Sequence, residues 1–465
     1  GRRYCLCLHS ILVVGAYLSH QFRADGLQIL PQLHQWDGQE TERGGEMKIV
    51  LTLLLMVAAI SGAPLFVVIS AVALLWFYFM GIDLSIVIIE MYRLASNPLL
   101  IALLFFAFAG YTLAESGAGK RLVKLSTAIF GCVRGGLAVV ALLSCAFFTA
   151  LTGASGITIV ALGGLLLPAL LEDRYPEDFS LGLLTSSGSL GLLFPPSLPM
   201  IIYGVVAGVS IPQLFLAGLI PGILLVVLLA IYSMYKGVRG ECRIISFNSR
   251  ELLDTTRETI WEILLPVVVF GGIYSGFLAV SEAAVVTLIY VLAVALLINR
   301  DVKLSQMPTI VVKTVVMVGS IIIILGAALA FNSVLIDQQI PSKILLWIQG
   351  HVESKFFFLI ILNIFLLLVG CVLDVYSALV IVAPLIVPIA QSYDINLLHL
   401  GIIFLTNLQI GYSTPPIGMN LFIASLRFEK PILRLGVASL PFLGILLVAL
   451  LIITFVPGLS LLLVR

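Results

Sequence analysis

The sequence predicts an all-α polytopic membrane protein built from two related halves, and three observations lead to that prediction. Of its 465 residues, 61% are hydrophobic and 11% are charged, whereas a soluble domain carries about a quarter charged residues. Apolar runs of roughly 18 or more residues, enough to cross a hydrocarbon core of about 30 Å, recur along the chain. Two of these runs contain adjacent prolines, Pro195–Pro196 and Pro415–Pro416, at matching places in the two halves.

Composition also excludes other classes of protein. The net charge is +1, and no basic patch is interleaved with aromatic residues, so the sequence does not indicate a nucleic-acid partner. The six cysteines follow neither metal-ligand nor disulfide spacing. We therefore expect no cofactor and no partner that is a nucleic acid.

Residues 1–46 differ from the rest of the chain, because their charged residues and histidines surround a single apolar run that is too short to span a bilayer. We interpret them as an N-terminal extension and keep two alternatives. In one, Met47 is the natural start and the preceding residues are not native. In the other, they form an amphipathic arm that lies on the membrane surface.

The first half is predicted to cover 47–235 and the second 259–465, with a polar cytoplasmic linker at 236–258. Apolar segments lie at 48–61, 63–81, 96–115, 137–170, 181–208 and 211–235, and again at 261–280, 282–299, 314–335, 356–390, 397–424 and 432–456. Segments 137–170 and 356–390 are too long for one span and are interrupted midway. Each is either a tight pair of full spans or a re-entrant hairpin.

The two halves repeat each other at a fixed offset. The Pro-Pro pairs are 220 residues apart (415 − 195), and the same offset relates Gly191 to Gly411, Pro168 to Pro388 and Pro221 to Pro441. Each half has about five spans plus a hairpin, and an odd number of crossings turns the second copy over. The sequence therefore predicts two inverted-topology repeats, an architecture of secondary transporters whose sites lie at broken helices.

The Pro-Pro pairs predict broken helices at 181–208 and 397–424. Proline lacks a backbone donor and clashes with the preceding turn, so the helix must unwind. Unwound backbone at membrane depth is tolerated where it is buried in protein or lines a polar cavity. Hydroxyl, amide and glycine residues gather at both breaks and supply carbonyl and hydroxyl oxygens for a small cation, and N–H groups for a carboxylate. The alternative is a proline kink that only shapes packing.

The two hairpin turns carry the remaining candidate residues. The first turn, TALTGASGITIV, offers the hydroxyls of Thr152 and Ser155, although its small residues also suit helix packing. The second turn contains Asp374, an intramembrane carboxylate, which indicates either a functional site or the N-cap of a half-helix. We interpret Glu282 as the cap at the start of another helix.

Lysine and arginine favour cytoplasmic loops and give an orientation. With both hairpins treated as re-entrant and Met47 outside, most of these residues fall inside, including Arg121, Lys313 and Arg434. Replacing each hairpin by two spans leaves this count unchanged, so charge does not decide between the two readings of the hairpins.

From Met47 onward the chain resembles the large membrane subunit of tripartite ATP-independent periplasmic (TRAP) transporters. The motifs that carry this resemblance are TGAS, SSGSLGLLFPPSLPMIIYG, SGFLAVSEAA, GCVLD and NLQIGYSTPPIGMNLF. The resemblance implies an elevator-type, sodium-coupled importer of organic anions in a bacterial inner membrane. It also implies two partners, which are a small four-helix membrane subunit and a periplasmic substrate-binding protein.

The resemblance places one Na⁺ site at Thr152, Ser155, Gly370, Gly411 and Thr414. It places a second site at Ser187, Gly188, Gly191 and Asp374. Candidate substrate-binding residues are Ser189, Asn407 and Ser413. The sequence departs from the family's pattern at Thr152, Ala154 and Phe194, and Phe194 leaves the shape of the substrate pocket open.

Other functions are alternatives to this sodium-coupled importer. The main alternative is a stand-alone ion-coupled carboxylate carrier of a related elevator fold, which needs no binding protein. An intramembrane protease is disfavoured because Asp374 has no second aspartate on a facing span, and no enzymatic activity is expected. The predicted cargo is a small carboxylate such as a C4-dicarboxylate or a sugar acid.

Overall fold

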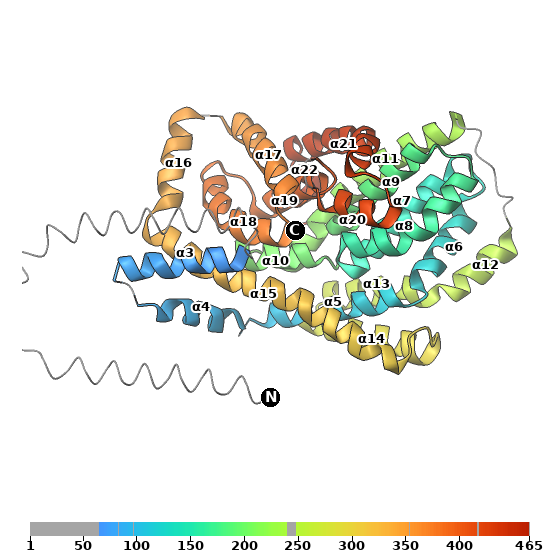
Figure 1. Cartoon of the computed structure of the whole chain (residues 1–465), viewed down its shortest axis with the longest axis horizontal. Helices are drawn as coiled ribbons and strands as arrows, with labels where there is room; N and C mark the ends of the chain where they lie inside the picture. Colours follow the sequence, from blue (N-terminus) through green and yellow to red (C-terminus); the bar gives the residue numbers. More distant parts are fainter. Residues whose placement is uncertain are drawn as a thin grey trace, which may run out of the picture. The chain divides into compact units, whose positions relative to one another are not determined.

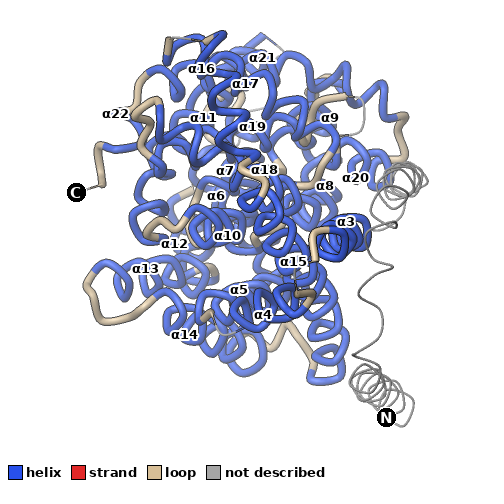
Figure 2. The backbone as a smooth tube through the Cα atoms, turned by 90° about the vertical axis from the view of Figure 1, so that its left-hand side faces the viewer, coloured by secondary structure: helices blue, strands red, loops and turns tan. Residues whose placement is uncertain are grey.

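The computed structural model describes residues 65–81, 83–95, 97–239, 248–352, 354–415 and 418–464. The predicted extension at 1–46 therefore lies outside the described residues. The chain divides into two units, 1–72 and 73–465, and the elements from α4 onward belong to the second. Throughout the described ranges the secondary structure is helical, with no strand (Figure 2).

The helices have the following bounds. In the first half they are α3 (Leu65–Phe79), α4 (Ser85–Ala95), α5 (Pro98–Glu115), α6 (Ala118–Phe130), α7 (Gly136–Thr152), α8 (Ser155–Glu172), α9 (Glu177–Ser187), the 3₁₀ helix η1 (Leu190–Leu193), α10 (Leu198–Ala207) and α11 (Ile211–Arg239). In the second half they are α12 (Ser249–Glu258), α13 (Ile260–Tyr274), α14 (Val280–Ala293), the π-helical η2 (Val294–Ile298), the 3₁₀ helix η3 (Leu304–Gln306), α15 (Met307–Asp337), α16 (Ile340–His351), α17 (Lys355–Val372), α18 (Val375–Ser392), α19 (Leu397–Gly411), α20 (Met419–Phe428), α21 (Ile432–Phe455) and α22 (Gly458–Leu461) (Figure 1).

The helices confirm the prediction of an all-α, multi-pass membrane protein. In the described part of the chain, eight helices are long and apolar enough to cross a membrane. The pair formed by α9 with η1 and α10 passes the same test and is bent by 47°. The two segments that are too long for one span, 137–170 and 356–390, each form two helices joined by a turn, α7–α8 and α17–α18.

The offset of 220 residues recurs in the helix bounds. Helix α8 begins at Ser155 and α18 at Val375, and both contain 18 residues. Helices α6 and α16, α7 and α17, and α10 and α20 occupy equivalent places within about two residues, and α19 begins at the equivalent of the start of α9 but ends four residues later. Packing follows the same rule, because α8 packs on α20 and the equivalent pair, α18 and α10, also packs together. The two halves are therefore interlocked, and each hairpin is held by the other half.

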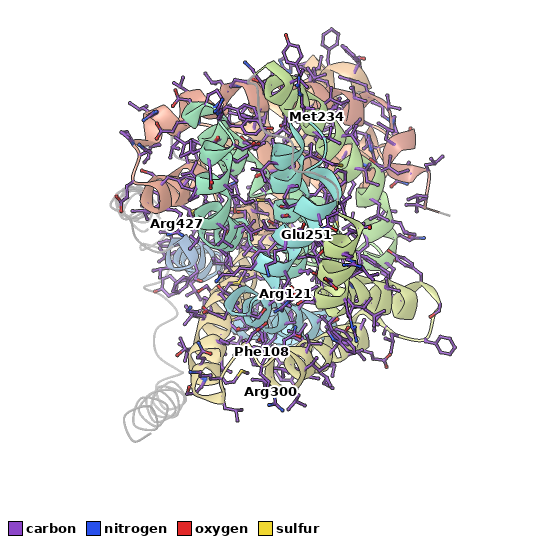
Figure 3. The ribbon with its side chains drawn as sticks, turned by 90° about the vertical axis from the view of Figure 1, so that its right-hand side faces the viewer. Phe108, Arg121, Met234, Glu251, Arg300 and Arg427 are labelled. Carbon is purple, nitrogen blue, oxygen red and sulfur yellow. The ribbon has the colours of Figure 1, made fainter. Side chains whose placement is uncertain are left out.

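Glycine allows one of these contacts to be close. A Cβ atom at Gly156 would lie 2.5 Å from Ile423 Cδ1, and one at Gly163 would lie 2.8 Å from Phe428 Cζ. At Gly164 it would overlap the guanidinium of Arg427, which is labelled in Figure 3. Small residues let helix backbones approach closely where no hydrophobic force drives them together. Helix α8 therefore presents a glycine face to α20.

Two regions differ from the segments read in the sequence. The predicted segment 314–335 is part of a longer helix, α15, of 31 residues. Its equivalent in the first half is divided into α4 and α5. Within the predicted linker 236–258, α12 forms a polar helix whose N-cap, Asn248, accepts from the backbone N–H of Arg250.

Candidate ion and substrate site

The helices are interrupted at Pro195–Pro196 in the first half and at Pro415 in the second. Helix α9 ends at Ser187, the chain turns through η1 and Pro195, and α10 starts only at Leu198. In the second half α19 ends at Gly411 and α20 starts at Met419, with Pro415 between them. Pro416 lies outside the described residues. The breaks leave backbone groups without partners from their own helix, as expected where proline stops the ladder of hydrogen bonds.

The first hairpin turns over two residues. Helix α7 ends at Thr152, Gly153 follows with φ +69°, and Ala154 is extended before α8 begins at Ser155. A left-handed residue that ends a helix is most often glycine, because glycine has no Cβ to clash. Gly153 therefore accounts for the tightness of this turn.

The second hairpin turns at Leu373 and Asp374, and the capping alternative for Asp374 is confirmed. Its carboxylate accepts hydrogen bonds from the backbone N–H groups of Tyr376 and Ser377, each at 3.1 Å, and from the Ser377 hydroxyl. The predicted cap at Glu282 is confirmed as well, since this carboxylate accepts from the Ala279 N–H at 2.9 Å.

Replacing Asp374 with alanine is expected to lower the free energy of unfolding by about 1 kcal/mol, because the start of α18 loses its cap. Asparagine caps a helix about as well as aspartate does. Asp374→Asn should therefore keep the melting temperature of the purified protein, measured without Na⁺. Equal melting temperatures for the alanine and wild-type proteins would contradict the structural role of this carboxylate.

Each hairpin tip lies against the break of its own half. In the first half the Thr149 hydroxyl donates to the Gly188 carbonyl at 2.8 Å. A Cβ at Gly188 would lie 3.5 Å from the Ser155 carbonyl oxygen, and one at Gly191 would lie 2.3 Å from the Ala146 carbonyl oxygen. The first tip and the first break therefore touch through backbone atoms.

The second half has the same arrangement. The Gly418 N–H donates to the Cys371 carbonyl at 3.3 Å, and the Val375 N–H donates to Tyr412 Oη at 2.5 Å. A Cβ at Gly411 would lie 2.6 Å from the Gly370 carbonyl carbon. Gly370 and Gly411, assigned to one site from the sequence, are therefore adjacent.

The grouping of the other candidate ion ligands into two sites stays a prediction. Ser155 lies beside the break that contains Gly188. Asp374 caps α18, and the next residue, Val375, donates its N–H to Tyr412 of the second break. The first hairpin tip, Asp374 and Tyr412 all line one cavity.

The three candidate substrate residues are fully buried, and two of them, Ser189 and Ser413, join elements of the two breaks. The Ser189 hydroxyl donates to the Gln409 carbonyl at 3.3 Å, and the Ser413 hydroxyl donates to the Thr185 carbonyl at 3.5 Å. Asn407 donates to Asn363 Oδ1 at 2.7 Å. Their role in binding substrate stays a prediction.

A cavity of about 980 Å³ lies where the two hairpin tips meet. Tyr376 of the second tip donates its hydroxyl to the Gly153 carbonyl of the first tip at 3.0 Å. The tips form one wall, and α5 and α15 form the opposite wall through Tyr111, Glu115, Lys313 and Met317. The cavity therefore separates the hairpins from two long helices.

Sequence reasoning missed Lys313 as a cavity residue. Its position near the start of an apolar segment had indicated a cytoplasmic loop, but its ammonium pairs with Glu115 of α5 at 2.5 Å and both side chains line the cavity. The two residues are 198 positions apart, so no local sequence signal could have paired them.

Several buried polar atoms near the breaks have no hydrogen-bond partner in the described structure. They are Thr152 Oγ1, Ser186 Oγ, both amide atoms of Gln409 and Asn420 Oδ1. A buried unpaired polar atom is costly, and such atoms mark places where an ion, a water or a ligand is bound. The orphaned Thr152 hydroxyl lies at the first hairpin tip.

Paired hairpins, paired broken helices and a cavity at their meeting point define a polytopic membrane transport protein. A family model for the DctM component of the tripartite ATP-independent periplasmic transporters matches residues 49–459. The chain belongs to this family, as a TRAP transporter large permease subunit. The predicted resemblance is thus confirmed. Permeases of this family work with a small membrane subunit and a periplasmic binding protein.

Named relatives agree with this assignment. The C4-dicarboxylate TRAP transporter large permease protein DctM of Pseudomonas aeruginosa is 36% identical over 374 residues, covering 80% of this chain and 88% of that protein. The ectoine/5-hydroxyectoine permease UehC of Ruegeria pomeroyi is 30% identical over 420 residues, covering 89% and 98%. The solved YdaH transporter of Alcanivorax borkumensis has a similar fold, with a TM-score of 0.57, 14% identity, and coverage of 81% and 87%.

Proposed function

We propose that this protein is the membrane subunit of a sodium-coupled secondary importer of a small organic anion in a bacterial inner membrane. A periplasmic binding protein delivers the anion, and a small four-helix subunit completes the membrane complex. The observation that carries the proposal is the meeting of two hairpin tips at one cavity, each backed by a broken helix. Secondary transporters bind substrate and ion at such breaks.

The proposed Na⁺ ligands form two clusters. The first cluster comprises Thr152, Ser155, Gly370, Gly411 and Thr414. The second comprises Ser187, Gly188, Gly191 and Asp374. Hydroxyl, carboxylate and carbonyl oxygens are hard ligands that suit Na⁺, and helix C-termini present carbonyls with partial negative charge. The buried, unpartnered Thr152 hydroxyl supports the first cluster.

We propose that transport follows an elevator mechanism built on inverted repeats. Helices α5, α14 and α15 pack together and would form the static scaffold. The hairpins and broken helices would form the moving part, joined to the scaffold by α6 and α16. A Cβ at Gly110 of α5 would lie 2.7 Å from Thr152 Cα, so the moving part fits closely against the scaffold in this conformation.

Coupling follows from differential binding. Na⁺ and substrate shift the equilibrium between the conformations of the moving part only by as much as they bind one conformation more tightly than the other. Transport is coupled when both stabilise the conformation in which the moving part can cross the membrane. Each Na⁺ that enters with the membrane potential contributes about 2.3 kcal/mol per 100 mV if it crosses the whole field. The potential acts on the net charge that crosses, so two Na⁺ that enter with a monovalent anion are driven as one positive charge.

The test is uptake into proteoliposomes that contain the complete membrane complex, with the binding protein and a radiolabelled organic anion outside. We expect uptake that requires an inward Na⁺ gradient and the binding protein, and that rises when the interior is made negative. Uptake that is unchanged when choline replaces Na⁺ would contradict the proposal. Full Na⁺-driven uptake without the binding protein would instead identify a stand-alone carrier.

A further inference from the structure

One ion pair lies on the cavity wall opposite the hairpin tips. Glu115 is the last residue of α5, Lys313 lies in the second turn of α15, and Lys313 Nζ is 2.5 Å from Glu115 Oε1. The two helices pack side by side (Figure 1), and both side chains line the cavity. The pair therefore belongs to the proposed static scaffold, whereas the tips across the cavity belong to the proposed moving part.

The position of this pair indicates a role other than holding α5 to α15. Its side chains are 47% (Lys313) and 38% (Glu115) exposed, and ion pairs that water reaches contribute little to stability. Both residues belong to helices that can span a membrane. Ionisable residues in such helices are costly and usually mark a functional site or a pathway for ions and substrates. The charges of the pair are therefore available to whatever enters the cavity.

Glu115 leaves the scaffold wall without net charge. In the described part of the chain, the charged residues that line the cavity are Glu115, Lys313 and Asp374. Asp374 lies on the other wall, where it caps α18 and belongs to a proposed Na⁺ cluster. Most of the remaining lining is apolar, including Val316 and Ile423. Without Glu115, the scaffold wall would present one uncompensated ammonium group to the tips.

An uncompensated ammonium would weaken the dependence of the anion on Na⁺. In the proposed mechanism, Na⁺ at the tips supplies the positive charge beside the anion. Lys313 alone would attract the same anion whether or not Na⁺ is bound, because a charge at a protein surface is screened only in part. Na⁺ and substrate are coupled only as far as each raises the affinity for the other. A second, permanent source of positive charge would therefore reduce the coupling.

We propose that Glu115 neutralises Lys313 so that the cavity holds an organic anion only together with Na⁺ and releases it when Na⁺ leaves. Glu115 acts on the anion through the charge of Lys313 and not by contact. The effect belongs to the conformation in which the tips face α5 and α15. This inference rests on the proposed function and adds to it a residue that maintains coupling.

Substitutions of the two partners should have opposite effects on anion affinity. Glu115→Gln leaves Lys313 unpaired, and Lys313→Met leaves Glu115 unpaired. The probes are radiolabelled succinate and gluconate, bound to the purified membrane complex in Na⁺. We expect tighter binding in Glu115→Gln and weaker binding in Lys313→Met, each by about two- to tenfold, the range for one unit charge between water and a protein surface. Changes in the same direction in both variants would indicate a structural role and overturn the inference.

The ratio of anion affinity in Na⁺ to that in choline measures the coupling directly. Glu115→Gln should lower this ratio, because Lys313 then supplies part of the attraction that Na⁺ supplies in the wild type. The double variant Glu115→Gln with Lys313→Met restores a neutral wall and should return the ratio toward the wild-type value. An unchanged ratio in Glu115→Gln, or no recovery in the double variant, would overturn the inference.

The pair of Lys124 with Glu258 provides a matched control. Its side chains are 64% and 54% exposed, and neither residue lines the cavity. Glu258→Gln also leaves a lysine unpaired and changes the net charge by the same amount, but it should change neither the affinity nor the ratio. Equal effects of Glu258→Gln and Glu115→Gln would show a general effect of net charge and overturn the inference.

A thiol in the cavity reports the charge of the wall without any substrate. Val316 lines the cavity three residues after Lys313. In Val316→Cys, the rate of modification by an anionic methanethiosulfonate, divided by the rate for a cationic one, should rise with Glu115→Gln and fall with Lys313→Met. The protein without this substitution supplies the background rates of its own cysteines. A ratio of rates that does not respond would overturn the inference.

Failure of this inference can be distinguished from failure of the proposed function. Na⁺-driven uptake by the wild-type complex, with an affinity ratio that Glu115→Gln does not change, would overturn the role of Glu115 and leave the importer standing. Wild-type uptake that is independent of Na⁺ would remove the sodium-coupled importer itself, and this inference with it.

Discussion

Replacing Gly191 with alanine is expected to destabilise the protein by about 3 kcal/mol, at the upper end of overpacking effects, and to abolish transport. The new methyl carbon would lie 2.3 Å from the Ala146 carbonyl oxygen and 2.4 Å from the Ala150 backbone nitrogen. Both atoms belong to the backbone of α7, so no side chain can move aside. The first break would have to separate from the first hairpin, which disrupts the proposed ion cluster as well as the packing.

The control is Gly444→Ala in the exposed face of α21, where an added Cβ has no heavy atom within 4 Å. Alanine is favoured over glycine in a helix by up to about 1 kcal/mol, so this variant should be as stable as wild type or more stable. The measurements are the yield of folded complex, its melting temperature and Na⁺-driven uptake. A Gly191→Ala protein with wild-type stability and uptake would show that the close approach of the break and the hairpin is not required.

Replacing Arg121 with alanine is expected to cost about 3–5 kcal/mol, because it leaves a buried carboxylate without its counter-ion. Arg121, labelled in Figure 3, lies in the first turns of α6 and pairs with Glu262 of α13 at 2.5 Å and with Asp301 at 2.6 Å. The Glu262 side chain is 0% exposed, and its second oxygen has no partner in the described structure. Removing the guanidinium therefore leaves the Glu262 carboxylate buried, without a counter-ion and out of contact with water.

A neighbouring pair, between Lys124 of the same helix and Glu258 of α12, provides the control. Lys124 and Glu258 are 3.6 Å apart, and their side chains are 64% and 54% exposed. Exposed pairs contribute about 0–1 kcal/mol, so Lys124→Ala should change the melting temperature little. The double variant Arg121→Met with Glu262→Leu should recover much of the loss, because it removes the buried charge together with its partner. Equal effects of the Arg121 and Lys124 substitutions would refute the special role of burial.

Because α6 joins α5 to the first hairpin, the Arg121 network ties the start of this connection to α13 and to the segment before α15. In an elevator mechanism the connection must be held at one end while the hairpin moves at the other. The expected loss of stability is therefore accompanied by a loss of Na⁺-driven uptake.

Local chemistry determined several features that the sequence predicted correctly. Helix α19 ends four residues before Pro415, whose missing N–H and steric clash act within about one turn, whereas α9 ends eight residues before Pro195 and the 3₁₀ helix η1 lies between them. The caps at Asp374 and Glu282 are set by residues at most three positions away. The fixed offset of 220 residues is a property of the sequence, and the helices reproduce it.

Contacts between distant segments decided the rest. Gly370 and Gly411 are neighbours because the second hairpin packs on the following break, and nothing in their spacing along the chain required that contact. The pairing of Lys313 with Glu115 and the bridge from Tyr376 to Gly153 join residues about 200 positions apart. The sequence by itself therefore determined where helices stop, since those effects are local. Only the tertiary structure decided which helix ends lie next to one another, because their contacts depend on the packing of whole helices.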